Sequence, residues 1–72
     1  MDELELALFK VSKEVLRDNT LNAKQKLYLL IYRSYILQYP DQPTEDDMLA
    51  YTGMSRATYY RIKKSLKLRG LI

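Results

Sequence analysis

Two helix patterns separated by a single glycine occupy the last part of the chain, and they constrain the fold more than any other feature. Thr44 has the residue type of an N-cap, and Asp47 follows at the three-residue spacing of a capping box. The short stretch after them ends at Gly53, and glycine adopts the left-handed backbone conformation without steric penalty. This pattern predicts a helix over about residues 45–51 that ends in a tight turn. Its apolar side is expected from Met48, Leu49 and Tyr51.

The segment after the turn predicts a longer helix with one apolar and one basic side. Ser55 is a second N-cap, and no Pro or Gly follows until Gly70, so the helix is expected over about residues 56–69. Three apolar residues at helical spacing form a stripe that is expected to be buried: Tyr59, Ile62 and Leu66. The rest of the helix carries six basic residues and no acidic one: Arg56, Arg61, Lys63, Lys64, Lys67 and Arg69.

The turn also separates the charges of residues 44–72. This segment holds six basic and three acidic residues, and all the acids precede the turn while all the bases follow it. The whole chain has a net charge of +3 at pH 7. A basic face on one helix is typical of a nucleic-acid-binding surface, although a solvated helix with a basic bias carries the same charges.

The residues around the turn resemble a known family. The run TGMSRATYYR, residues 52–61, resembles the turn and recognition helix of a helix-turn-helix, and LKLRGLI, residues 66–72, is similar to the point where winged-helix domains leave that helix. The resemblance is close over residues 49–72 and loose over residues 21–72. It suggests the DNA-binding modules of phage replisome organisers and small bacterial transcription regulators. It departs at Leu49, where many such domains have a small residue, and at the wing, which is expected to be absent or truncated.

The helix patterns and this resemblance together predict an all-α bundle of four helices that ends in a helix-turn-helix. The resemblance implies binding of double-stranded DNA, in replication or transcription control, with residues 56–69 in the major groove. Arginine is the residue most often bidentate to guanine, so arginines are expected to read the sequence. Base contacts are expected from Arg56, Ala57, Tyr60, Arg61 and Lys64. Phosphate contacts are expected from Thr58, Lys63 and Lys67, with Ser55 as a cap or phosphate donor.

Residues 3–17 predict the first helix. Its apolar stripe consists of Leu4, Leu8, Val11 and Val15, widened by Ala7, Phe9 and Leu16. This stripe indicates a helix that covers the core. Because Leu6 and Phe9 fall off the main stripe, a dimerisation or partner helix is the alternative.

Residues 23–39 predict the second helix, with Asn22 and Gln25 as a variant capping box and Pro40 closing the segment. The helix is apolar on nearly every side, which predicts a central, buried position. A tyrosine row runs along it: Tyr28, Tyr32, Tyr35 and Tyr39. Packing or a subunit contact explains this row better than a stacking platform for single-stranded nucleic acid.

Composition excludes several other functional classes. The 72 residues contain neither His nor Cys, so disulfides, zinc sites and the commonest catalytic bases are missing, and no enzyme activity or cofactor is expected. A chain of this length predicts a single domain, residues 1–72. No apolar run approaches the roughly 20 residues that span a bilayer, and the acidic start is unlike a signal peptide. A soluble, cytoplasmic protein is expected.

A protein-interaction module of the same fold, which would bind a replication or transcription partner, is the alternative function. Three surfaces are candidates for a homodimer or a protein partner: the first helix, the tyrosine row and Leu68.

Overall fold

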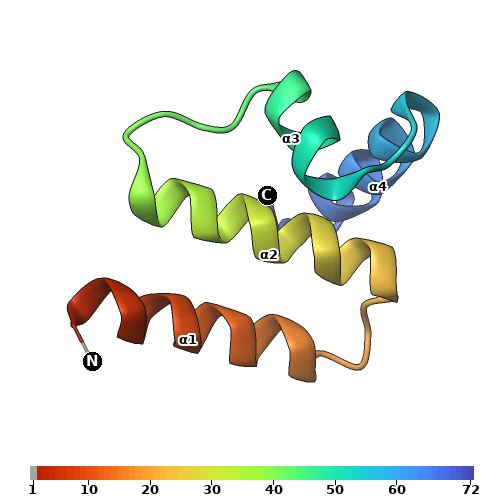
Figure 1. Ribbon diagram of the computed structural model, residues 1–72. Coiled ribbons are helices and arrows are strands. Elements are labelled where there is room, and N and C mark those ends of the chain that lie inside the picture. Colours follow the sequence, from red (N-terminus) through yellow and green to blue (C-terminus); the bar gives the residue numbers. More distant parts are fainter. Residues whose placement is uncertain (1) are drawn as a thin grey trace.

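The computed structural model describes residues 2–72, which form four α-helices and contain no strand (Figure 1). In chain order the helices are α1 (Glu3–Arg17), α2 (Ala23–Gln38), α3 (Glu45–Thr52) and α4 (Arg56–Leu68). Each begins at the predicted residue, and the ends of α2, α3 and α4 differ from the prediction by one residue. The all-α class with four helices is confirmed. None of these helices has the length and apolar character needed to cross a membrane.

Side-chain caps explain where the four helices begin. The residue before each helix accepts a hydrogen bond from the backbone N–H three residues later, and these caps are Asp2, Asn22, Thr44 and Ser55. At α2 and α3 the bond is reciprocal, because Gln25 and Asp47 accept from the backbone N–H of their cap. Both predicted capping boxes are therefore confirmed. Each one satisfies backbone donors that the helix itself leaves free.

Asp47 gives the capping box of α3 a dependence on pH. The backbone N–H of Thr44, followed by its hydroxyl, lowers the pKa of Asp47 below its ordinary value of 3.8. Because the folded-state pKa is the lower one, the ionised carboxylate stabilises the fold above about pH 4, and this contribution disappears as the pH falls through the folded-state pKa. We expect Asp47→Asn to lower the melting temperature at neutral pH and to flatten its fall in acid, as followed by circular dichroism.

A matched variant controls for the general effect of acid. Asp41→Asn removes a carboxylate that makes no hydrogen bond among residues 2–72, so its acid profile should follow that of the parent. Equal slopes for the parent and Asp47→Asn would contradict this role of Asp47.

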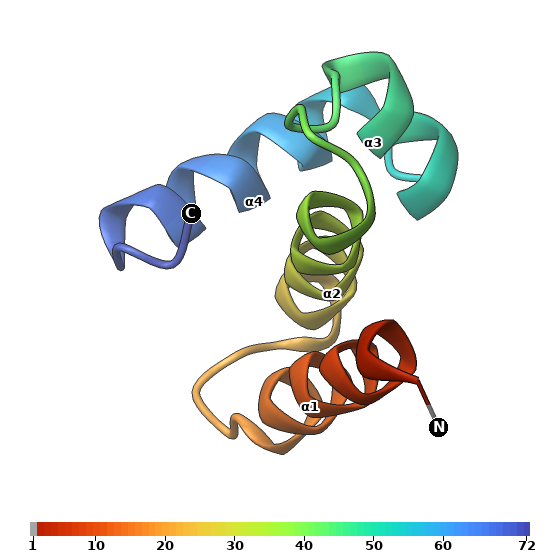
Figure 2. The same ribbon diagram turned by 90° about the vertical axis from the view of Figure 1, so that its left-hand side faces the viewer.

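α2 is the central helix and packs against the other three. Both views show α1 along one side of α2, with α3 and α4 on the other (Figures 1 and 2). The buried core comes from all four helices and the connection after α1: Val15, Leu21, Tyr28, Leu29, Met48, Tyr59, Ile62 and Leu66. The predicted stripe of α4 is thus buried in full, which determines the side of α4 that stays open.

Gly70 turns the chain back after α4. Its φ is 72°, in the left-handed region, and its N–H donates to the Lys67 carbonyl at 3.0 Å. The N–H of Leu71 donates to the Leu66 carbonyl, also at 3.0 Å. These two bonds form the Schellman arrangement that ends many helices. Leu71 and Ile72 consequently pack against the core instead of continuing along the axis of α4.

Some predictions about burial are wrong. Leu4, expected on the buried stripe of the first helix, is exposed. Phe9 and Leu16, expected to widen that stripe, are exposed too, because α1 packs mainly against α2. Tyr51, expected on the apolar side of α3, is also exposed, because its ring borders an open hollow. α2 is central but not buried on every side, since its neighbours leave three of its large apolar residues and its C-cap exposed: Leu27, Ile36, Leu37 and the cap Tyr39.

Candidate nucleic-acid interface

The turn of residues 53–55 determines how α4 leaves α3. Gly53 has φ 69° and ψ 12°, and its N–H donates to the Leu49 carbonyl at 3.0 Å. Ser55 then accepts a hydrogen bond from the N–H of Thr58 at 3.3 Å. The predicted glycine turn and the Ser55 cap are both confirmed. A backbone bond before the turn and a side-chain cap after it therefore hold the direction in which α4 starts.

α4 presents most of the predicted site residues on the side opposite its buried stripe. Seven of the nine are exposed: Ser55, Arg56, Ala57, Tyr60, Arg61, Lys64 and Lys67. The other two, Thr58 and Lys63, are half-buried. At roughly 100° per residue, three of the nine point most directly away from the stripe: Ala57, Arg61 and Lys64. Thr58 lies on one flank of that direction, and Lys63 and Lys67 lie on the other.

Two of these residues, Arg56 and Tyr60, contact acidic residues of α3. No sequence pattern predicts these contacts. The carboxylate of Glu45, at the start of α3, accepts a hydrogen bond from the Tyr60 hydroxyl at 2.8 Å. Its other oxygen lies 2.9 Å from Arg56 Nε, an ion pair without the alignment of a hydrogen bond. Asp46 approaches the same guanidinium at 4.0 Å. Arg56 and Tyr60 are therefore held by the acidic first turn of α3.

The bond to Glu45 also favours the protonated form of Tyr60. The hydrogen bond to the carboxylate, followed by desolvation, raises the pKa of Tyr60. The hydroxyl is therefore a hydrogen-bond donor that is already occupied by Glu45 at neutral pH. No spacing in the sequence indicates these contacts with α3, because they depend on the angle at which α3 and α4 cross.

The other bases of the predicted site have no acidic partner. Among residues 2–72, ion pairs within 4.0 Å involve Arg56 alone, so the charges of Arg61, Lys63, Lys64 and Lys67 are uncompensated. Lys63 Nζ lies 5.7 Å from the centroid of the Tyr59 ring, a cation–π contact that orients the ammonium. A shallow hollow of about 500 Å³ lies on this surface, between Tyr60, Lys63, Lys64, Lys67 and Leu68. Clustered cations of this kind attract a polyanion.

Arg69, the sixth base of the helix pattern, has a structural role. Its guanidinium donates to the carbonyl of Thr20 at 3.1 Å and to the Thr20 hydroxyl at 2.5 Å. The hydroxyl and backbone N–H of Thr20 in turn donate to Asp18, and these bonds lower the pKa of Asp18. The end of α4 is thereby joined to the connection between α1 and α2, and Arg69 is not part of the open basic surface.

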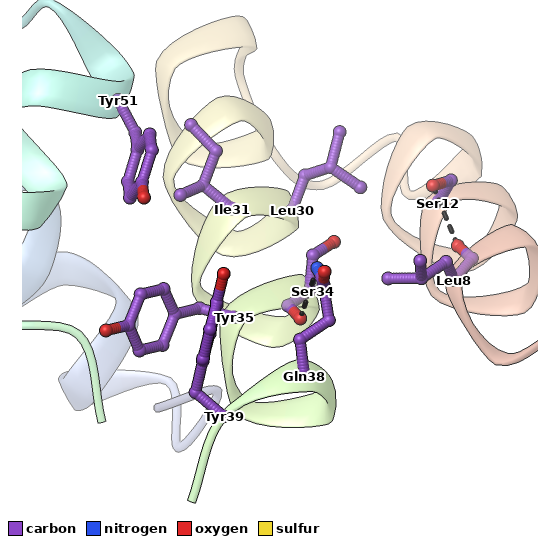
Figure 3. Close-up of a pocket in the computed structure, with 9 residues that line it drawn as sticks. All are labelled: Leu8, Ser12, Leu30, Ile31, Ser34, Tyr35, Gln38, Tyr39 and Tyr51. Carbon is purple, nitrogen blue, oxygen red and sulfur yellow. Dashed lines mark hydrogen bonds between the residues drawn. The ribbon is translucent and has the colours of Figure 1, made fainter. Parts of the chain in front are cut away.

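A larger hollow, of about 660 Å³, lies between α1, α2 and α3 (Figure 3). Nine residues line it: Leu8, Ser12, Leu30, Ile31, Ser34, Tyr35, Gln38, Tyr39 and Tyr51. None of them belongs to α4, and none carries a charge at neutral pH. The hollow therefore offers no cation to a phosphate backbone, and it is separate from the basic surface of α4.

The tyrosine row runs from the buried Tyr28 to the exposed C-cap Tyr39, with Tyr32 and Tyr35 half-buried between them. The Tyr28 ring lies 6.3 Å from that of Tyr32 and 5.7 Å from that of Tyr59, measured between centroids. Burial, followed by the neighbouring Tyr59, raises the pKa of Tyr28. Tyr35 packs 4.6 Å from the exposed Tyr39. Because the rings pack on one another instead of lying free in a row, packing accounts for this feature better than base stacking does.

No family model matches this chain, and no curated protein or solved structure matches it. The exposure, charge and geometry of the side chains described above therefore carry the functional conclusion.

Proposed function

We propose that this chain binds double-stranded DNA, with α3, the turn and α4 acting as a helix-turn-helix and α4 lying in the major groove. The observation that carries this proposal is the open surface of α4, where four bases without acidic partners lie outside the buried stripe. α4 has 13 residues, which give a length of roughly 20 Å at about 1.5 Å each. The major groove, about 12 Å wide, accepts a helix of this kind.

The directions of the side chains suggest separate roles. Among the basic side chains of α4, Lys64 and Arg61 point most directly away from the core and are the proposed base contacts, with the small Ala57 leaving room beside them. Lys63 and Lys67 on one flank of α4, and Thr58 on the other, would face the phosphates on the two walls of the groove. Ser55, the cap of α4, lies at the helix N-terminus, where its neighbouring backbone N–H groups also favour an anion.

Arg56 has two effects in this arrangement. It neutralises part of the acidic first turn of α3, which would otherwise repel the DNA backbone. Its side chain remains 66% exposed, so guanidinium N–H groups that do not face Glu45 can still contact DNA. The resemblance to phage replisome organisers and bacterial transcription regulators extends the proposal to replication or transcription control in the cytoplasm.

Two alanine variants test the proposed roles. Arg61→Ala should weaken binding to the preferred duplex by roughly 1–3 kcal/mol and relax discrimination at one position, because a base contact carries specificity. Lys67→Ala should weaken binding to all duplexes about equally and reduce the salt slope by about one unit, because a phosphate contact releases counterions. Affinity titrations at several salt concentrations, on the preferred and a scrambled duplex, measure both effects.

Lys10→Ala serves as the matched control, since this exposed lysine lies on α1, on the other side of α2 from α4. It should leave the salt slope unchanged. If the parent protein has no salt-sensitive affinity for duplex DNA, the DNA-binding proposal fails. The alternative, a protein-interaction module, is then favoured by Leu68, an apolar side chain of α4 that is 79% exposed.

A further inference from the structure

α1 carries a second apolar face on the side away from the core. Its inner stripe includes the buried Val15 and packs on α2. Leu6, Phe9 and Leu16 lie outside that stripe and are 45%, 56% and 57% exposed. At roughly 100° per residue, the centres of the two faces are about 150° apart around the helix. This outer face of α1 is therefore left uncovered by the rest of residues 2–72.

The outer face has the spacing of a helix-packing surface. Its positions 6, 9, 13 and 16 alternate between steps of three and four residues, as in helices that pair side by side. Lys13 occupies the one polar position, where its aliphatic stem can cover apolar surface while the ammonium reaches water. A shallow hollow of about 400 Å³ adjoins it, lined by Phe9, Ser12, Lys13, Leu16 and Arg17. The face is thus shaped to receive side chains from another helix.

The charges of α1 select both the partner and its orientation. Acidic residues gather at the N-terminal end: Asp2, Glu3 and Glu5. Basic residues follow towards the C-terminal end: Lys10, Lys13 and Arg17. The one acidic residue among them, Glu14, lies on a different side of the helix. None of them forms an ion pair among residues 2–72. A second α1 laid antiparallel places each acidic end beside a basic end and opposes the two helix dipoles, whereas a parallel one places like charges together.

We propose that two copies of this chain associate through the outer face of α1, with the two helices antiparallel about a twofold axis. In the register that fits the spacing, Leu6 of each copy packs against Leu16 of the other, and Phe9 packs against the stem of Lys13. Along one edge of this helix pair, Glu3 of each copy then lies beside Arg17 of the other, with one such contact at each end. The Lys10 side chains of the two copies lie together at the middle of that edge and repel each other. This repulsion and the small contact area make the dimer weak and dependent on concentration.

Sedimentation equilibrium without DNA tests the association, and its result does not depend on whether α4 binds DNA. The parent should move from one chain mass, 8.6 kDa, towards twice that value as the concentration rises. Phe9→Glu places a charge in the centre of the outer face and should remain at the mass of one chain. Its helicity should equal that of the parent, because the Phe9 side chain lies outside the core.

Leu68→Glu is the matched control, since it makes the same change at an exposed apolar residue of α4 and should leave the mass behaviour of the parent intact. A parent that stays at one chain mass at every concentration would overturn the proposal and leave the outer face to a different protein. A Phe9→Glu variant that is folded and still dimerises would overturn it as well.

Single cysteines test the orientation, because the natural chain has none. Under mild oxidation, Leu6→Cys mixed with Leu16→Cys should give the mixed disulfide, since these positions face each other. Either variant alone should cross-link poorly, because the two copies of the same residue lie about 15 Å apart along the helices, beyond the reach of a disulfide. Efficient self-linking of Leu6→Cys would indicate parallel helices and contradict the antiparallel arrangement, even if Phe9→Glu did not fold.

Discussion

Replacing Tyr28 with alanine should destabilise the protein by about 3–5 kcal/mol, in line with other truncations of buried aromatic side chains. Tyr28 is only 2% exposed and packs against Tyr32 and Tyr59, so its ring connects the central helix to α4. It also borders an existing cavity of about 240 Å³, and truncation would enlarge this space where the neighbours cannot easily collapse. In a domain of this size the melting temperature should fall by roughly 12 °C or more.

Tyr39→Ala provides the comparison within the same tyrosine row. Tyr39 is 51% exposed and caps the end of α2, so its truncation should change stability by a small fraction of the Tyr28 effect. Thermal melts of the two variants under one condition measure the difference. Equal losses would mean that Tyr28 and Tyr39 do not differ in burial in solution.

Gly53→Val should lower the free energy of unfolding by about 1–3 kcal/mol through backbone strain. Gly53 has φ 69°, a conformation that is an outlier for a β-branched residue. A Cβ added there would meet no atom within 4 Å, so crowding at the Cβ does not contribute. The turn between α3 and α4 must then either hold a strained residue or change its path. Denaturant unfolding measures this cost, and the affinity for DNA reports any change in the direction of α4.

A series of substitutions separates strain from other effects at Gly53. Asparagine tolerates the left-handed conformation better than alanine, and alanine better than valine, so stability should fall in the order Gly, Asn, Ala, Val. The open space around this position means that side-chain volume alone predicts no such order. A valine variant as stable as the parent would show that the turn does not require the left-handed conformation in solution.

The helix boundaries could be predicted because the residues that determine them are close in sequence. Thr44 and Asp47 are three positions apart, and they meet whatever the rest of the chain does. The buried stripe of α4 followed from helical periodicity in the same way. Periodicity identifies residues that share a face, but it does not show how many helices cover that face. This is why Phe9 and Leu16 were expected inside and lie outside.

Tertiary contacts of the predicted DNA-binding residues could not be predicted from the sequence. Position on α4 alone predicts DNA contacts for the Tyr60 ring and the Arg56 guanidinium. Their contacts with Glu45 arise because the turn at Gly53 brings the start of α3 over the start of α4, across 11 positions of sequence in the case of Arg56. A tertiary contact of this kind depends on the crossing of two helices, which no local pattern encodes. The other bases of the predicted site make no such contact and remain candidates for DNA binding: Arg61, Lys63, Lys64 and Lys67.

The placement of α1 and α4 on opposite sides of α2 has a consequence for any dimer formed through the outer face of α1 (Figure 2). Such a dimer would carry its two basic surfaces at its far ends, pointing in opposite directions. Dimers that grip a palindromic site need both recognition helices on one side, about one helical turn of DNA apart. This dimer would instead hold two separate duplexes, or two distant segments of one molecule, and draw them together. Its DNA complexes would grow into networks and would show no preference for a fixed spacing between half-sites.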